Sequence, residues 1–224
     1  INVTPPPNVA PVAAAQAVTT LEDKAVAIRL TASDANGDPL GFLILSQPTM
    51  GTLSGSAPNL TYTPHADANG SDSFTFRAND GKADSNTATV SIAVNAVNDA
   101  PEGTDNTVTT LEDTPYVFSA ADFGFSDPND SPAHTLLSVI ITTLPAAGQL
   151  LLGVTPVTLG QEIPAAQLGT LSFVPATDAD GASYASFTFQ VKDNGGTAFG
   201  GQDTDQSPNT ITIRSEEPHV ELQS

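Results

Sequence analysis

The sequence contains no cysteine and no tryptophan, and only 6 lysine and arginine residues accompany 25 aspartate and glutamate residues. Without cysteine, the chain has neither disulfide bridges nor thiolate metal sites. A formal net charge of −19 excludes the basic face that nucleic-acid binding requires, and it opposes docking on an anionic membrane. No apolar run approaches the roughly 18 residues of a membrane span. We therefore predict no nucleic-acid partner and no membrane insertion.

Aspartate dominates the acidic residues, and 17 glycines and 18 prolines accompany it. Aspartate favours turns and the sites of hard cations, whereas glutamate and lysine are typical of helix surfaces. The acidic surface has two explanations, solubility and cation binding, and the positions of the acids must decide between them. Hydrophobic residues make up 39% of the chain, which is too many for a disordered protein. The composition indicates a folded protein rich in turns.

The sequence repeats itself at the length of a domain. The segment Val18–Asp23 recurs, residue for residue, as Val108–Asp113. Further landmarks follow in the same order in both halves: Ser33-Asp34 with Ser126-Asp127, Leu60–Pro64 with Leu171–Pro175, and Ser73–Phe76 with Ser186–Phe189. Internal repetition on this scale indicates tandem modules of one fold.

The repeat sets the expected domain boundaries. We predict a linker at 1–8, one module at 9–98, a second module at 99–214, and a tail without strand pattern at 215–224. The offset between matching residues grows from 97 at Gly51 and Gly148 to 111 at Pro64 and Pro175, so the second module carries 14 extra residues. We expect them to form an inserted hairpin near 149–170, with Val154–Leu159 as one arm. A first residue other than Met suggests a fragment of a longer protein.

Period-two alternation of apolar and polar residues dominates both halves and predicts β-strands. In Ser73–Ala78 the two phenylalanines share one face, and Val90, Ile92 and Val94 do the same in a later segment. Turn pairs such as Asn36-Gly37 separate the segments. About seven short strands per module predict an all-β fold of two tandem immunoglobulin-like β-sandwich domains without helices.

The acidic and amide side chains gather at the predicted strand ends, and the same acids recur there in both modules. Calcium takes six to eight oxygen ligands from carboxylates, amides and carbonyls. The alternative is that these residues only form turns, but their recurrence favours calcium for the set. The candidate ligands are Glu22, Asp23, Asp34, Asn36, Asp38, Asp80, Asn98, Asp99, Glu112, Asp113, Asp127, Asn129, Asp130 and Asp193. The Asp34 loop is not an EF-hand, because Pro39 stands where that loop needs glycine.

Motifs for catalysis are missing. The three histidines, His65, His134 and His219, have no metal-ligand spacing, and the sequence contains no nucleophile elbow and no phosphate-binding loop. Only three tyrosines and no tryptophan are present, which argues against a sugar-stacking cleft. We predict that the protein is not an enzyme.

The order of these motifs resembles the bacterial cadherin-like, immunoglobulin-like repeats that occur in tandem in large secreted adhesins, including those exported with RTX-type signals. The resemblance covers the first module fully. The second module departs from it at Phe125–Pro132 and Asp193–Gly195. The motifs that carry the resemblance are Leu21–Asp23, Asp34–Asp38, Tyr62–Phe76, Asn79–Gly81 and Val97–Pro101.

The resemblance implies calcium held at the joints between modules, in a secreted or cell-surface protein that we expect to be monomeric. By that likeness Glu22, Asp80, Asn98 and Asp99 converge near the module boundary, together with Asp127 or Asp130. Three functions stay open: a stiff structural repeat of an adhesin, a carbohydrate-binding module, and homophilic adhesion to another cell. Expected partners are neighbouring modules and, for the alternatives, cell-surface glycans or another cell. Exposed aromatic side chains at Phe123, Phe125 or Phe199 would support carbohydrate binding.

Overall fold

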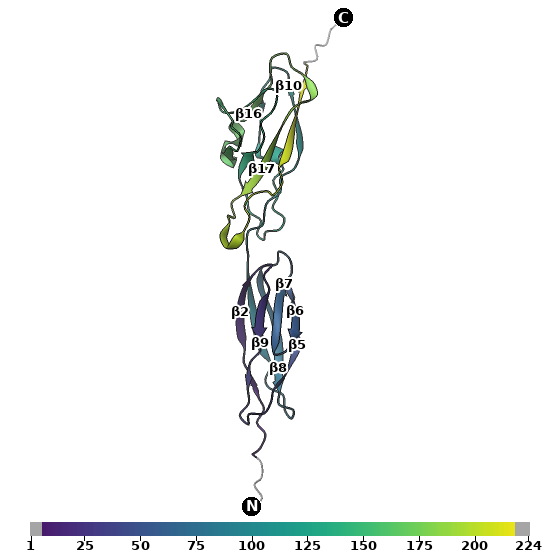
Figure 1. The fold of residues 1–224 in the computed structure, drawn as a ribbon, viewed down its shortest axis with the longest axis vertical. Helices are drawn as coiled ribbons and strands as arrows, with labels where there is room; N and C mark the ends of the chain where they lie inside the picture. Colours follow the sequence, from purple (N-terminus) through teal and green to yellow (C-terminus); the bar gives the residue numbers. More distant parts are fainter. Residues whose placement is uncertain (1–5, 218–224) are drawn as a thin grey trace, which may run out of the picture. The chain divides into compact units, whose positions relative to one another are not determined.

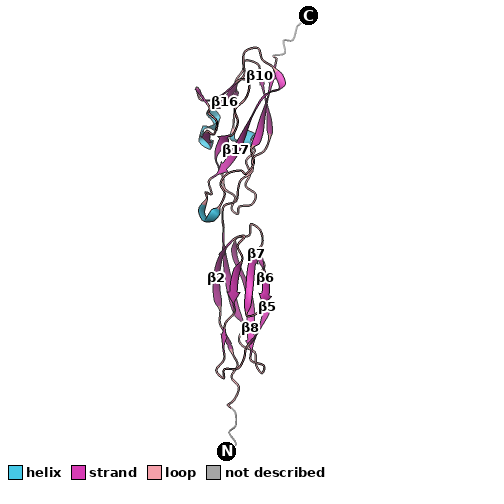
Figure 2. Ribbon diagram, viewed as in Figure 1, coloured by secondary structure: helices cyan, strands magenta, loops and turns pink. Residues whose placement is uncertain are grey.

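The computed structural model describes residues 6–217, which form two compact units with a boundary between Val97 and Asn98. Both units consist almost entirely of strands and loops, with helix only in short segments of the second (Figure 2). The predicted all-β class is confirmed. Among the residues described, no helix has the length and hydrophobicity to cross a membrane.

The first unit is a β-sandwich whose strands run side by side along its length (Figure 1). Strand β2 is parallel to β9, and the other neighbours are antiparallel. One sheet has the order β2 (Gln16–Leu21), β9 (Ala88–Asn95), β8 (Gly70–Asn79) and β5 (Gly41–Ser46). The other has the order β3 (Val26–Arg29), β7 (Asn59–Pro64) and β6 (Gly51–Ser56), and β1 (Val12–Ala13) pairs with β4 (Ala32–Ser33).

The core of the first unit follows the predicted alternation. Phe74 and Phe76 of β8 are fully buried, as is Val90 of β9, whereas Ser73 and Ser91 face outward. Tyr62 of β7 is also buried and donates its hydroxyl hydrogen to Asp72, 2.8 Å away. The sandwich therefore closes on an apolar core with the buried carboxylate of Asp72 against it.

The second unit repeats this plan with the same number of strands and adds three short 3-10 helices. The larger sheet has the order β10 (Asn106–Leu111), β18 (Asn209–Glu216), β17 (Gly181–Asp193), β12 (Leu136–Ile141) and β15 (Glu162–Pro164). The smaller has the order β11 (Tyr116–Val117), β16 (Leu171–Val174), β13 (Gln149–Leu152) and β14 (Thr155–Pro156). The helices are η1 (Ala120–Phe123), η2 (Ala165–Thr170) and η3 (Ala198–Gly200). They were not predicted, because turns this short have no helical periodicity.

The extra residues of the second unit form more than a hairpin. Strands β13 and β14 pair around Gly153, but β14 has only two residues and stops before Val157, which is buried in the core. The chain then crosses to the other sheet, where β15 pairs with β12 and buries Ile163. The predicted arm Val154–Leu159 is therefore too long: β14 ends at Pro156, and one further backbone hydrogen bond, from Val157 to the carbonyl of Leu150 at 3.0 Å, continues its pairing with β13.

The last strand extends further than the sequence pattern predicts. Strand β18 continues through Glu216, because its final residues pair in parallel with Thr110 and Leu111 of β10. Ser215 is buried and donates to the carbonyl of Ala179 at 2.9 Å. The expected start of the tail at residue 215 is therefore wrong by two residues. The rest of the predicted tail, His219, and residues 1–5 of the predicted linker lie outside the described residues.

Candidate metal centre

Four acidic or amide side chains form a buried polar group at the end of the second unit where the chain enters it. Asn98 belongs to the entering segment, Asp127 and Asp130 to the loop before β12, and Asp193 ends β17. Their exposed fractions are 9%, 7%, 8% and 0%, respectively. Polar groups buried this deeply need partners.

The orientation of Asn98 is set by its amide nitrogen. Nδ2 donates to both carboxylate oxygens of Asp193 at 3.2 Å and to the carbonyl of Gln202 at 2.6 Å. The amide oxygen then points the other way, and Oδ1 is buried without a hydrogen-bond partner. Gly195 lies against this oxygen, since a Cβ at Gly195 would be 1.6 Å from Oδ1.

Asp127 presents a second oxygen of the same kind. Its Oδ2 accepts a hydrogen bond from the backbone nitrogen of His134, while its Oδ1 is buried without a partner. Asp130 accepts from the backbone nitrogen of Asp99 at 3.0 Å. One ligand atom from each of Asp127, Asp130 and His134 lies within 4.8 Å of the others, so these side chains could hold one ion.

The charge of this cluster is poorly compensated. Burial, followed by the neighbouring Asp127 carboxylate, raises the pKa of Asp130, although the backbone of Asp99 and the imidazole of His134 act in the opposite direction. The His134 Nδ1 atom lies 3.5 Å from Oδ2 of each aspartate. A bound cation would favour the ionised carboxylates. Among the buried atoms of this cluster without a hydrogen-bond partner, Asn98 Oδ1 and Asp127 Oδ1 are oxygens and His134 Nδ1 is a nitrogen. Together with the carboxylate of Asp130, this mainly oxygen donor set suits a hard cation such as calcium.

The corresponding end of the first unit has a related cluster. Asn8 Nδ2 donates to Asp80 Oδ2 at 2.9 Å, and the backbone nitrogen of Asp38 donates to Asp34 Oδ1 at 3.0 Å. Backbone hydrogen bonds, that from Ala83 foremost, and the one from Asn8 lower the pKa of Asp80. The predicted residues Asp34, Asn36, Asp38 and Asp80 are thus all placed at this end.

Asp80 does not lie beside Glu22, in contrast to what the resemblance implied. Strand β2 runs parallel to β9 and β9 runs antiparallel to β8, so the ends of β2 and β8 fall at opposite ends of the sheet. Asp80 follows β8 and Glu22 follows β2. The strand order within the first unit therefore separates these two acids.

Each unit has a smaller acidic group at its other end. In the first unit Glu22 is buried and accepts from the backbone of Val97 and from Asn69 Nδ2 at 3.3 Å. Asp23, at φ 54°, accepts from the backbone nitrogen of Asp67 at 3.4 Å. These contacts hold the acids of this end in place in the first unit.

In the second unit the backbone nitrogen of Asp178 donates to Asp113 at 3.3 Å, as that of Asp67 donates to Asp23 in the first unit. Burial, and then the charges of Glu217, Asp113 and Asp178, raise the pKa of Glu112. This end therefore also concentrates uncompensated negative charge.

The structure adds three acidic or imidazole residues to these groups that were not predicted from the sequence, and it places one predicted ligand outside the buried group. No metal-ligand spacing is predicted for His134, yet it stands four residues after Asp130, and one atom from each of Asp127, Asp130 and His134 lies within 4.8 Å of the others. Asp67 and Asp178 stand three residues after the matching prolines Pro64 and Pro175. Asn129 is exposed and lies outside the buried group, although its neighbour Asp130 is inside it. A loop without regular periodicity does not reveal which of two adjacent side chains turns inward.

Residues 8–93 match the family model described as bacterial Ig domain. A search of curated proteins found no match. Among solved structures, human mucin-like protocadherin EC1-2 is 15% identical with a TM-score of 0.50, over 92% of this chain and 98% of that one. Protocadherin gammaB7 EC3-6 is 15% identical with a TM-score of 0.53, over 93% and 52%. At such identities these likenesses show the fold alone, and the predicted resemblance to bacterial immunoglobulin-like and cadherin-like repeats is confirmed.

An endo-fucoidan hydrolase from glycoside hydrolase family 107 also matches, at 20% identity over 95% of this chain. Its TM-score of 0.36 carries no argument. The chain spans only 30% of that enzyme's length. Immunoglobulin-like domains are non-catalytic in general, and the absence of enzyme activity in this chain stays a prediction.

Proposed function

We propose that the chain is a pair of structural modules of a bacterial surface or secreted adhesin, and that bound calcium orders the ends of these modules. The premise is the match between residues 8–93 and bacterial immunoglobulin-like domains. Domains of this family are typically extracellular or surface-exposed. We propose further that this adhesin is of the RTX type.

One observation carries the calcium proposal. Asn98 Oδ1 and Asp127 Oδ1 are buried oxygens without hydrogen-bond partners, in a cluster with the buried carboxylates of Asp130 and Asp193. An unsatisfied buried acceptor costs about 1–3 kcal/mol. Two of them in one carboxylate cluster are best explained by an ion that completes their coordination. Calcium accepts carboxylate and amide oxygens in flexible geometry at about 2.3–2.6 Å.

The position of Asn98 links calcium to stiffness. Asn98 and Asp99 belong to the segment that enters the second unit, and an ion bound to Asn98 together with Asp127 ties that segment to the loop before β12. Extracellular calcium modules bind at about 10⁻⁴–10⁻³ M. The entering segment would thus be ordered outside the cell and loosened where calcium is scarce.

Calcium is expected to raise the unfolding temperature of the second unit by several degrees. A dissociation constant of about 10⁻⁴–10⁻³ M corresponds to roughly 1.4–2.7 kcal/mol of stabilisation at about 10 mM free calcium. The measurement is differential scanning calorimetry of the whole chain with calcium or with chelator. Sodium chloride at equal ionic strength controls for general screening of the −19 charge.

The variant Asp127→Asn provides the matched test of the site. It keeps the shape of the side chain and removes one negative charge. We expect the calcium-dependent increase in the unfolding temperature of the second unit to be largely lost, while the unfolding temperature of the first unit stays unchanged. Equal midpoints of the unmodified protein in calcium and in chelator would contradict the proposal.

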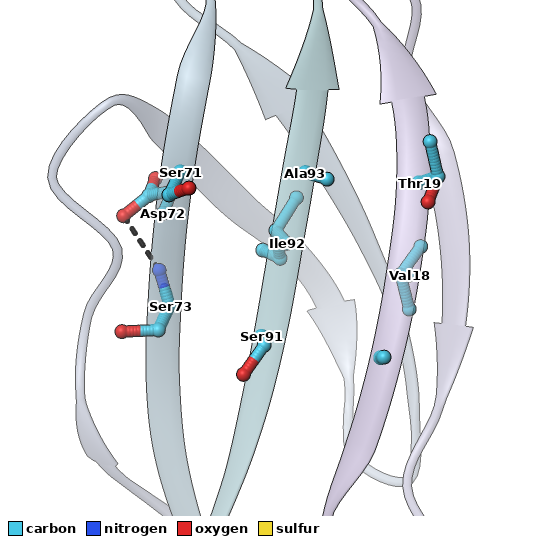
Figure 3. Close-up of a pocket in the computed structure, with 9 residues that line it drawn as sticks. Val18, Thr19, Ser71, Asp72, Ser73, Ser91, Ile92 and Ala93 are labelled. Atoms are coloured by element: carbon cyan, nitrogen blue, oxygen red, sulfur yellow. Dashed lines mark hydrogen bonds between the residues drawn. The ribbon is translucent and has the colours of Figure 1, made fainter.

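Carbohydrate binding has less support from the structure. Phe123 is fully buried and Phe125 packs against the core, so of the three predicted aromatics only Phe199 is exposed, at 78%. A surface depression of about 420 Å³ crosses β8, β9 and β2 of the first unit, but small and polar side chains line it, including Thr19, Ser71 and Ser91 (Figure 3). The depression offers no aromatic platform on which a sugar would stack, and of the three predicted aromatics Phe199 alone is exposed for such stacking.

A further inference from the structure

The clusters at the entering ends of the two units are built by the same contacts. In both, an asparagine amide donates to an aspartate at the end of the long strand, either Asp80 just after β8 or Asp193 as the last residue of β17. In both, a backbone nitrogen of the entering segment also donates to a loop side chain. In both, a loop aspartate accepts from the backbone four or seven residues later. The resulting matches are Asn8 with Asn98, Asp80 with Asp193, Asp34 with Asp127, Asn36 with Asp130, and Asp38 with His134.

The turn after the long strand also matches, but its side chain differs. The backbone nitrogen of Lys82 donates to Asp80 Oδ1 at 2.7 Å, and that of Gly195 donates to Asp193 Oδ1 at 2.7 Å. Lys82 and Gly195 each stand two residues after the aspartate. One unit therefore has a lysine where the other has no side chain.

The Lys82 ammonium contacts the amide oxygen of Asn8, and the matching oxygen of Asn98 in the second unit has no hydrogen-bond partner. Lys82 Nζ lies 3.4 Å from Asn8 Oδ1 and 3.1 Å from Asp38 Oδ2. In the second unit the matching oxygen, Asn98 Oδ1, is buried without a hydrogen bond. Where the second unit leaves this oxygen unpartnered, the first unit supplies a positive charge from its own chain.

The residues around the first cluster are also less acidic than those around the second. Asp99 and Asp130 of the second unit correspond to Val9 and Asn36 of the first, so two acidic positions become neutral. Asp38, at the position of His134, adds one acid, and it is the one that pairs with the Lys82 ammonium. The first cluster thus has fewer acids and a cation from its own chain, the largely exposed Lys82 ammonium, so less negative charge is left for a divalent ion to neutralise.

We propose that the Lys82 ammonium takes the place of a metal ion at the entering end of the first unit, so that calcium binds at this position only in the second unit. The inference rests on the calcium site proposed above. Of the residues predicted from the sequence as metal ligands here, Asp38 then pairs with the lysine ammonium and Asp80 accepts from the lysine's backbone nitrogen. Asp34 and Asn36 belong to the same loop.

Asp34 Oδ2 is buried without a partner even with Lys82 in place, whereas the second cluster has two such oxygens, on Asn98 and Asp127. Of the two matching oxygens in the first cluster, the lysine thus partners only that of Asn8, and its removal would leave both available to an added ion.

The test is a calcium titration of the ¹⁵N-labelled whole chain, followed by the amide resonances of each cluster. In the unmodified protein we expect the amides of His134 and Gly195 to shift, and those of Asp38 and Gly81 to stay in place. In Lys82→Ala the amides of Asp38 and Gly81 should shift too, with an apparent dissociation constant at least about tenfold lower than in the unmodified protein. Lys24→Ala, which removes a lysine charge near the other end of the unit, should leave the pattern of the unmodified protein.

The two proposals fail in different signals. If Asp38 and Gly81 shift in the unmodified protein together with Gly195, or if they do not respond in Lys82→Ala, the lysine inference is wrong. If His134 and Gly195 do not respond to calcium, the proposed calcium site fails, while the response of the first unit to Lys82→Ala still decides whether the lysine blocks a cation site.

Discussion

Replacing Gly195 with alanine is expected to weaken calcium binding by the second unit about 100-fold without unfolding it. The new Cβ would lie 1.6 Å from Asn98 Oδ1 and 2.7 Å from His134 Cε1, so these side chains must move. Asn98 is held through Nδ2 by Asp193 and Gln202, and it can move only by giving up those contacts. Changes to the groups that orient a metal ligand typically cost about 10–100-fold in affinity, and here a proposed ligand is displaced directly.

Isothermal titration calorimetry with calcium measures this effect. The matched control is Gly196→Ala, because that glycine has φ +78° but a Cβ added there meets no atom within 4 Å. The control thus introduces the backbone strain of an alanine in the left-handed region without displacing Asn98, and it should bind calcium within about a factor of two of the unmodified protein. Unchanged affinity in Gly195→Ala would show that the Asn98 amide oxygen does not bind the ion.

Replacing Asp72 with alanine is expected to destabilise the first unit by about 4 kcal/mol, since several donors lose their acceptor at once. Asp72 accepts hydrogen bonds from the backbone nitrogens of Thr49 and Met50, both at 2.9 Å, and from the hydroxyl of Tyr62 at 2.8 Å. It also accepts from the backbone nitrogen of Ser73, the bond drawn in Figure 3. Chemical denaturation of the whole chain, analysed for the unfolding of the first unit, measures this loss of stability.

The second unit provides the control for this prediction. Phe173 and Ala185 stand at the positions of Tyr62 and Asp72, so that unit has neither the hydroxyl nor the carboxylate. The double variant Tyr62→Phe with Asp72→Ala copies this pair and removes the unsatisfied hydroxyl. It should lose less stability than the sum of the single changes, because residues in contact do not contribute independently. Strict additivity would show that the hydroxyl and the carboxylate are not coupled.

The same carboxylate predicts a pH dependence of the first unit. Burial by itself would raise the pKa of Asp72, but hydrogen bonds from Thr49, Met50, Tyr62 and Ser73 lower it. A carboxyl group with a lower pKa in the folded state stabilises the fold above its unfolded pKa of about 3.9, and this stability is lost as the pH falls through the folded value. The first transition should weaken below about pH 4, and Asp72→Ala should flatten this part of the profile. An unchanged acid profile in the variant would assign the pH dependence to other groups.

The sequence by itself determined the modules, the strands and the general location of the acids. The alternation that buries Phe74 and Phe76 is local, because successive side chains of a strand point to opposite faces. The recurrence of Val18–Asp23 as Val108–Asp113 likewise needs no structure to be seen. These features depend on neighbouring residues, and the prediction of two all-β modules follows from them.

Only the tertiary structure decided which acids act together. Asn98 meets Asp193 across 95 positions of sequence, and the order of strands separates Asp80 from Glu22. Side chains in loops have no fixed period, so their direction depends on contacts such as these. The same reason explains why the sequence did not reveal the reach of Lys82 to Asn8, which distinguishes the two clusters. The backbone hydrogen bonds of the two turns match, and the side chain of Lys82, which Gly195 lacks, decides whether the asparagine oxygen of each cluster already has a positively charged partner.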